Sequence, residues 1–175
     1  MSVNIDPLEL ASATALRTQL CSGTISAVQA VRDALDRCEA WKGLNAFITL
    51  RRDEALAEAR AIDAARATGR QLGALAGLPI VVKDNIALGG CLFTGGSPAF
   101  QTQVAPRDAS VVARLRTAGA IVVGKTNLHE LAFGITSKNS YFGAVRNPAD
   151  PARVAGGSSG GTAAAIASVL RRPSA

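Results

Sequence analysis

A lysine at the end of an apolar run and a distant glycine–serine loop are the residues whose types favour chemistry. Lys83 follows the β-branched residues 80–82, and the loop holds Ser158 and Ser159 between two pairs of glycines, Gly156, Gly157, Gly160 and Gly161. A lysine serves as a base only when its pKa falls toward neutrality, and burial beside a valine-rich strand lowers that pKa. A serine hydroxyl both donates and accepts hydrogen bonds, and glycines allow close backbone approach. These residues predict a proton relay from a second hydroxyl, through a serine, to Lys83.

The same residues also allow a purely structural interpretation. In that case Lys83 pairs with Asp84 or Glu130, and the glycine–serine loop only leads into a helix that starts at Thr162. Residue types and spacing alone leave both interpretations open.

Residues 119–126 match the nucleotide-binding P-loop pattern G-x-x-x-x-G-K-[ST]. A true P-loop follows a strand and opens a helix, because its variable residues present backbone N–H groups to a phosphate. Here the variable residues are Ala-Ile-Val-Val, which favour a strand, and a helical pattern precedes them. We therefore expect Lys125 to be structural or to lie at the rim of a site, with ATP binding as an alternative hypothesis.

Residues 157–161 also fit the G-x-S-x-G pattern of a nucleophile elbow. That fold needs an Asp or Glu and then a His after the serine, but the 16 residues that follow Ser159 contain none of these types. His129 is the single histidine and lies upstream, so we expect it to be a hydrogen-bonded structural side chain.

The elements that must position these residues alternate between helices and strands. Asp6-Pro7 favours the start of a helix that Gly23 ends, and Ser26 favours the start of a second helix. The further expected elements are a strand within 44–50, a helix over 53–68, a strand over 80–82, a helix capped by Asp108 and closed by Gly119, a strand over 120–123, a short helix over 128–133, a loop over 145–150 and a helix from Thr162. The strand–helix–strand order predicts an α/β fold with a mixed or parallel sheet.

The composition is that of a globular domain. Hydrophobic residues make up 48% of the 175 residues, and the net charge of +6 comes from 19 Lys+Arg against 13 Asp+Glu. Basic and acidic residues alternate over 51–70, which indicates a solvated helix face rather than a polyanion site. The three cysteines form no C-x-x-C pair, which favours reduced thiols and no zinc site. Neither a signal peptide nor a membrane-spanning run is evident, so we expect a cytoplasmic protein.

Four blocks of sequence, in this order, resemble the amidase signature family. They are residues 77–85 (GLPIVVKDN), 118–127 (AGAIVVGKTN), 147–148 (NP) and 156–165 (GGSSGGTAAA), within a resemblance that covers 6–168. The resemblance implies an α/β fold with a mixed central sheet flanked by helices. It also implies hydrolysis of carboxylic amides by a Ser–Ser–Lys triad that needs no metal or organic cofactor.

The resemblance assigns roles to individual residues. Lys83 matches the lysine of the family, and Ser158 matches its bridging serine, which characteristically follows a cis peptide bond, here Gly157–Ser158. Ser159 matches the second serine of the block, a supporting hydrogen-bond partner. In the implied mechanism neutral Lys83 takes a proton, through Ser158, from a nucleophilic serine that attacks the amide carbonyl, and water then hydrolyses the acyl-enzyme.

The nucleophile of the family belongs to a later D-T-G-G-S-type block, which also supplies backbone N–H groups for the oxyanion. No such segment follows Ser168 in this chain. We therefore expect a truncated amidase-signature domain, with a helical region over 1–76, the start of the catalytic core over 77–168 and an atypical tail over 169–175. The expected fold is incomplete, and the chain alone is expected to be inactive and to expose an apolar sheet edge.

Residues 128–137 resemble stand-alone small-amide hydrolases, such as mandelamide or indoleacetamide hydrolases, more than the A subunits of glutamine-dependent tRNA amidotransferases. The main expectation is an amidase that cleaves small carboxylic amides to an acid and ammonia or an amine. It binds neither nucleic acid nor a membrane, and a homo-oligomer is left open. The alternatives are an amidotransferase A subunit, or a non-catalytic fragment that binds a partner through its unpaired edge.

Overall fold

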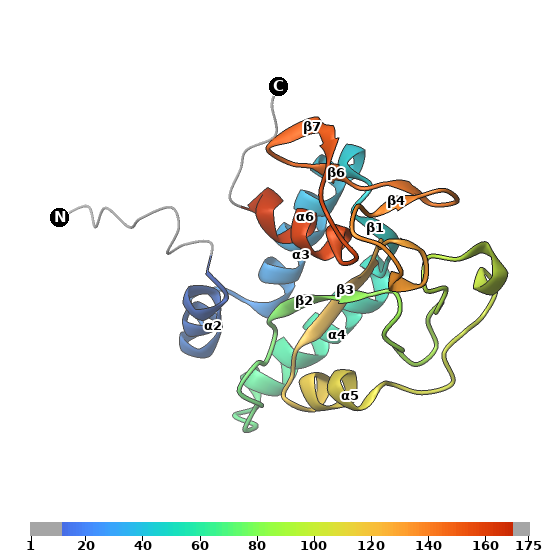
Figure 1. Ribbon diagram of the computed structural model, residues 1–175. Helices are drawn as coiled ribbons and strands as arrows, with labels where there is room; N and C mark the ends of the chain where they lie inside the picture. The colour runs from blue at the N-terminus through green and yellow to red at the C-terminus, as the bar shows by residue number, and fades with distance from the viewer. Residues whose placement is uncertain (1–11, 170–175) are drawn as a thin grey trace.

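The computed structural model describes residues 12–169 (Figure 1). Its helices are α2 (Ala13–Ser22), α3 (Ala27–Ala40), α4 (Arg52–Ala67), α5 (Ser110–Thr117) and α6 (Gly160–Val169), with short 3-10 turns η1 (Lys42–Leu44), η2 (Pro98–Phe100) and η3 (Glu130–Ala132). Its strands are β1 (Phe47–Leu50), β2 (Pro79–Lys83), β3 (Ile121–Thr126), β4 (Lys138–Asn139), β5 (Gly143–Ala144), β6 (Arg146–Asn147) and β7 (Asp150–Val154). The chain is thus an α/β protein, as predicted.

A three-stranded mixed sheet in the order β1-β3-β2 forms the centre of the molecule. β2 runs parallel to β3, whereas β1 runs antiparallel to it. The parallel pair confirms the predicted strand–helix–strand unit, because parallel neighbours need a crossover connection. Lys83 lies opposite Thr126 in the register, so the polar ends of the two parallel strands meet at one edge.

The central strand β3 is buried along its whole length because helices cover both faces of the sheet. Ile121 and Val123 pack with residues of α3 and α4 on one face. Val122 packs with Val82 of β2 and Val112 of α5 on the other face. Successive strand side chains point to opposite faces, so one apolar run serves two cores.

Caps fix the ends of the first helices. The Ser26 hydroxyl accepts a hydrogen bond from the Gln29 N–H at the start of α3, as its position predicted. Gly23, with a φ of 75°, ends α2 in the left-handed conformation that favours glycine. The expected helix start at Asp6-Pro7 lies outside the described residues.

Two local predictions were wrong, and a third is met only in part. Asp108 does not cap α5, because its carboxylate accepts hydrogen bonds from the Gly89 N–H and from Arg116. Residues 145–150 are not a plain loop, since β6 and β7 pair there as an antiparallel hairpin. The helix expected over 128–133 is only the 3-10 turn η3, in which Leu131 has a φ of 50° and donates its N–H to the Gly95 carbonyl.

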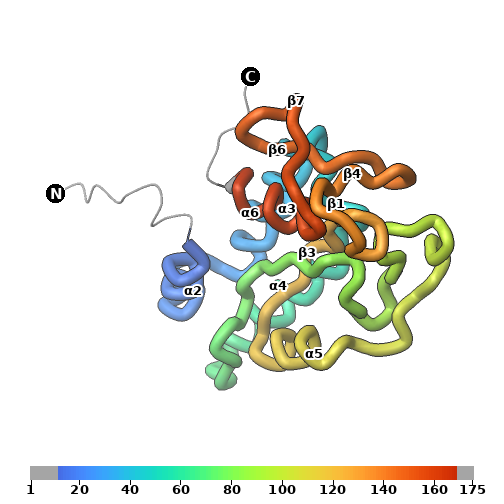
Figure 2. The backbone as a smooth tube through the Cα atoms, in the orientation of Figure 1, coloured from blue at the N-terminus to red at the C-terminus, as the bar shows by residue number. Residues whose placement is uncertain are grey.

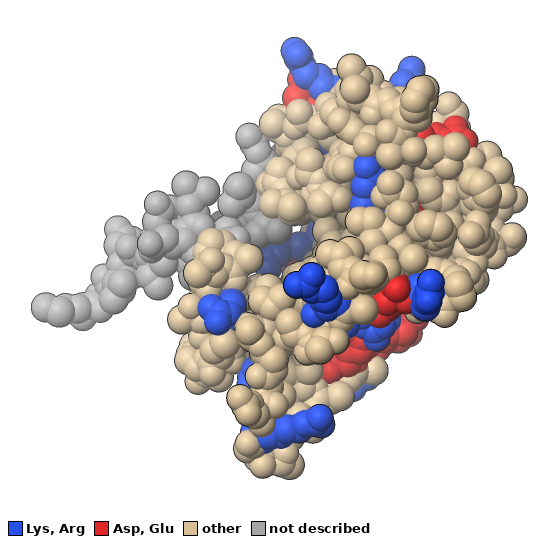
Figure 3. Space-filling view, turned by 60° about the horizontal axis from the view of Figure 1, so that its bottom comes forward, with Lys and Arg blue, Asp and Glu red and all other residues tan. Residues whose placement is uncertain are grey.

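The connection between β2 and α5 leaves the sheet and returns to it, with η2 as its only helical turn among the described residues (Figure 2). On the face that Figure 3 shows, Lys and Arg form separate groups with Asp and Glu among them. No helix within residues 12–169 is long and apolar enough to cross a membrane.

Candidate active site

The structure brings Lys83 and Ser158 together, although they are 75 positions apart in the chain. Lys83 is the last residue of β2, and Ser158 lies in the loop before α6. The Lys83 Nζ donates a hydrogen bond to the Ser158 Oγ at 2.8 Å. Both residues are half-buried, and burial lowers the pKa of the Lys83 amine. A lysine with a lowered pKa beside a hydroxyl is the arrangement that a serine-mediated proton relay requires.

The alternative pairing of Lys83 with Asp84 or Glu130 is wrong, because both carboxylates are engaged elsewhere. The Asp84 carboxylate pairs with the Lys125 ammonium at 2.9 Å, and both side chains are fully buried. The Glu130 carboxylate accepts a hydrogen bond from the Ser97 hydroxyl at 2.7 Å. Lys83 therefore faces the serine loop.

The P-loop hypothesis is contradicted as well. Residues 121–126 form the fully buried strand β3 rather than a phosphate-binding turn. Lys125 donates hydrogen bonds to Asp84 and to the Leu92 carbonyl, and its side chain is fully buried, out of reach of a nucleotide in solvent. Its buried ion pair with Asp84 agrees with the structural one of the two roles that the sequence predicted.

The peptide bond before Ser158 is cis, as the family resemblance implied. Each glycine of the loop has its own structural reason. Gly156 adopts a φ of 84°, a left-handed conformation that disfavours other residues. A Cβ on Gly157 or Gly160 would lie within 2.8 Å of Ser137 atoms, and a Cβ on Gly161 would lie 2.3 Å from the Asn127 carbonyl oxygen.

Further contacts attach the start of α6 to the end of β3. The hydroxyls of Thr126 and Thr162 lie 2.8 Å apart, and the Gly161 N–H donates to the Asn127 carbonyl at 3.1 Å. Since Thr126 is the register partner of Lys83, these bonds hold the serine loop beside the lysine. Ser159 is exposed in that loop, and its carbonyl accepts the Ala163 N–H.

Two residues outside the quoted blocks also contact the loop. The His129 backbone N–H donates to the Ser158 carbonyl at 3.1 Å, and its Nδ1 lies 3.3 Å from the Thr136 hydroxyl, so His129 is hydrogen-bonded as predicted. The buried Ser137 hydroxyl bonds both the Ser158 carbonyl and the Gly160 N–H. The sequence carried no signal for Ser137, because only the tertiary contact distinguishes it from other loop serines.

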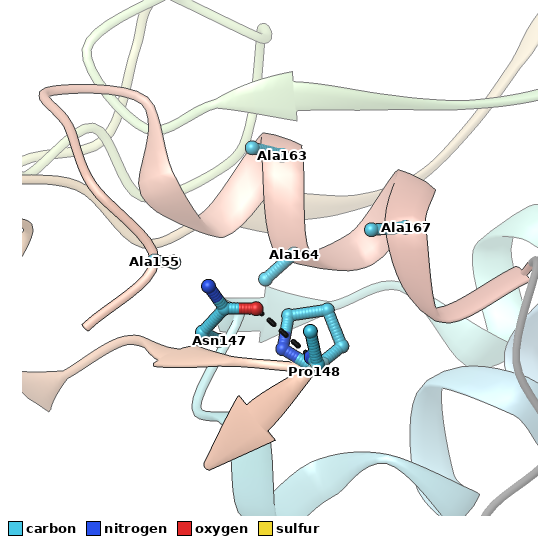
Figure 4. Close-up of a pocket in the computed structure, with 7 residues that line it drawn as sticks. Asn147, Pro148, Ala155, Ala163, Ala164 and Ala167 are labelled. Atoms are coloured by element: carbon cyan, nitrogen blue, oxygen red, sulfur yellow. Dashed lines mark hydrogen bonds between the residues drawn. The ribbon is translucent and has the colours of Figure 1, made fainter. Parts of the chain in front are cut away.

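A separate open hollow of about 460 Å³ lies between the β6–β7 hairpin and α6 (Figure 4). Its lining includes Asn147, Pro148 and several alanines of α6, and it contains neither Lys83 nor Ser158. Among residues 12–169, no group of three or more His, Cys, Asp or Glu side chains is arranged to hold a metal ion.

A family model for amidases matches residues 29–171. The chain belongs to the amidase signature family. This membership confirms the resemblance that the four sequence blocks indicated, together with the class of bond, the C–N bond of amides, on which the family's enzymes act.

Several solved structures share the fold of this amidase-family chain. The peptide amidase from Stenotrophomonas maltophilia is 36% identical with a TM-score of 0.83, over 91% of this chain and 34% of that chain. A bacterial aryl acylamidase is 32% identical with a TM-score of 0.86, over 94% of this chain and 35% of that one. A third structure is described as a vestigial protein complex that reveals the evolutionary origins of an s-triazine catabolic enzyme. The matching chain is 42% identical with a TM-score of 0.87, over 91% of this chain and 35% of that one.

Curated relatives point to a different subgroup from the one that residues 128–137 suggested. The A subunit of the glutamyl-tRNA(Gln) amidotransferase of Ralstonia nicotianae is 48% identical over 89% of this chain and 31% of that protein. Its counterpart in Chlorobium chlorochromatii is 44% identical over 93% of this chain and 34% of that protein. The chain thus spans 31–34% of the length of these relatives. They favour the amidotransferase alternative over the small-amide hydrolase.

Proposed function

We propose that this chain supplies the lysine–serine half of an amide-hydrolysing site. The observation that carries the proposal is the 2.8 Å hydrogen bond between the Lys83 Nζ and the Ser158 Oγ. Both residues lie within 77–168, the segment in which the sequence placed the start of the catalytic core. The nucleophilic serine and the oxyanion donors come, in this proposal, from outside the residues of this chain.

The proposed reaction uses Lys83 as a base. The neutral amine accepts the Ser158 proton while Ser158 accepts a proton from the nucleophilic serine, which attacks the amide carbonyl. The proton returns by the same path to the leaving amine, and water then hydrolyses the acyl-enzyme. Ser158 thus acts as a bridge and forms no covalent bond to substrate.

The amide that best fits the curated relatives is the side-chain amide of glutamine. We infer a role as the N-terminal part of the A subunit in a glutamine-dependent tRNA amidotransferase, which would work with partner proteins and a tRNA-linked acceptor. The support is the 48% and 44% identity to two such subunits. A small-molecule amidase is the second candidate, supported by the similarity to the peptide amidase and the aryl acylamidase.

A chimera tests the proposal. This chain replaces the matching segment of the Ralstonia nicotianae relative, to which it is 48% identical over 155 residues. Ammonia release is measured from glutamine with the partner proteins of that relative present, and from a small aromatic amide. Lys83→Ala and Ser158→Ala are compared with Lys138→Ala and Ser140→Ala, which remove an exposed lysine and an exposed serine.

The expected result is an active chimera in which the first two substitutions reduce the rate by about 10²-fold or more, as loss of a general base does. The two control substitutions leave the rate unchanged. Activity of Lys83→Ala close to the parent rate, or a folded chimera that releases no ammonia from either substrate, contradicts the proposal. Preference for glutamine or for the small amide decides between the two candidates.

A further inference from the structure

The buried side chain of Ser137 contacts the loop that carries Ser158. We propose that Ser137 is a positioning residue, whose single hydroxyl holds Ser158 in the orientation that reaches Lys83; this inference rests on the proposed function. Ser137 belongs to none of the four sequence blocks that indicated the family, and its side chain is fully buried.

The Ser137 hydroxyl makes hydrogen bonds on both sides of Ser159. Its Oγ donates to the Ser158 carbonyl oxygen at 3.3 Å and accepts from the Gly160 N–H at 2.9 Å. Gly160 is the first residue of α6, so its N–H has no partner within the helix. One hydroxyl thus closes the turn from Ser158 into α6, using its donor and an acceptor lone pair.

The backbone of Ser137 is itself held in place. Its φ of 51° lies in the left-handed region, and its carbonyl accepts the Val145 N–H at 3.0 Å. Ser137 therefore approaches the loop from a segment that is tied to the start of the β6–β7 hairpin. The position of Ser137 therefore depends on the bond to Val145 and not only on its contacts with the serine loop.

The glycines of the loop fit this role. A Cβ on Gly160 would lie 2.4 Å from the Ser137 Oγ and 2.6 Å from its Cβ, and a Cβ on Gly157 would lie 2.8 Å from its Oγ. Any other residue at these positions would push Ser137 away from the turn. The pair of glycines that flank the two serines therefore leave room for the Ser137 hydroxyl.

The consequence for the relay is geometric. The Ser158 carbonyl receives two hydrogen bonds, one from the His129 N–H and one from Ser137. Without the Ser137 hydroxyl, the Ser158 carbonyl keeps only the bond from the His129 N–H of these two. The Gly160 N–H, the first of α6, then loses its acceptor. Ser158 can then rotate about its backbone, and its Oγ loses the fixed position 2.8 Å from the Lys83 Nζ.

The test uses Ser137→Ala in the active chimera, with Ser140→Ala as the matched control, because Ser140 is an exposed serine of the same segment. Ser137→Cys is the second variant, since a thiol occupies the site with a weaker donor and acceptor. Both kcat and KM for ammonia release are measured at a temperature where circular dichroism shows every variant folded.

We expect kcat of Ser137→Ala to fall about 10- to 100-fold with KM changed less than about twofold, since a displacement near 1 Å costs a relay that much. Ser137→Cys should lie between the parent and Ser137→Ala. Parent-like kcat in Ser137→Ala, or a rise in KM at constant kcat, overturns the inference. If Lys83→Ala and Ser158→Ala also retain activity, the proposed function has failed; if only Ser137→Ala does, the positioning role alone has failed.

Discussion

Replacing Lys125 by methionine should destabilise the chain strongly, although Lys125 has no proposed part in the reaction. The Lys125 and Asp84 side chains are both fully buried and their charged atoms lie 2.9 Å apart. The methionine side chain would fill much of the volume but leave the Asp84 carboxylate without its counter-charge and the Leu92 carbonyl without the 3.0 Å bond from Nζ. Removing one partner of a buried ion pair costs about 3–5 kcal/mol, because a buried charge is left uncompensated.

The backbone N–H and hydroxyl of Thr94 still donate to Asp84, and they place the expected loss toward the lower end of that range. The measurement is urea unfolding followed by the fluorescence of Trp41, which packs against a buried cluster that includes Leu44 and Val145. With a urea m-value of about 2 kcal/mol/M, a loss of about 3–4 kcal/mol should lower the midpoint by about 1.5–2 M.

Lys138→Met is the control, because it removes an exposed lysine and should change the free energy of unfolding by less than about 0.5 kcal/mol. A Lys125→Met midpoint equal to that of the control would refute the argument, since it would mean that the pair is not buried as described. The double variant Asp84→Asn/Lys125→Met should recover part of the loss, because it removes the uncompensated charge.

Three further outcomes follow from the same contacts. Burial lowers the pKa of the Lys83 amine below its ordinary value of 10.5. Because the neutral amine is the proposed base, the rate of ammonia release should rise with pH, with a midpoint below 10.5. A midpoint at 10.5 in the pH profile of the rate would contradict this prediction. Gly160→Ala would place a Cβ 2.4 Å from the Ser137 Oγ, so it should lower the free energy of unfolding by about 1–3 kcal/mol and also reduce activity. Gly43→Ala, whose Cβ would have nothing within 4 Å, is the control and should do neither. Equal shifts of the melting temperature in the two variants would contradict this prediction. Asp63→Ala removes the acceptor for the Ala27 and Val28 N–H groups at the start of α3 and should cost about 1–2 kcal/mol by urea unfolding, a loss that an unchanged midpoint would disprove.

The sequence determined the local features of the proposed half-site. The β-branched run before Lys83 forms β2, and the apolar run over 120–123 forms part of the buried strand β3, because a strand covered on both faces needs a continuous apolar pattern. Capping at Ser26 and the chain turn at Gly23 were also predictable, since each depends on one residue and its immediate neighbours. The glycine–serine loop and its block order identified the family.

Tertiary structure alone decided which side chains meet. The bond between Lys83 and Ser158 joins positions 75 apart, the Asp84–Lys125 pair joins positions 41 apart, and Ser137 contacts the loop from 21 positions away. Asp84 and Lys125 each stand beside other polar residues in the sequence, so spacing cannot tell which of the two lysines takes the carboxylate. The packing of β2 against β3 decides it. Lys83 ends β2 and reaches the serine loop, whereas Asp84, in the turn that follows, pairs with Lys125 of β3.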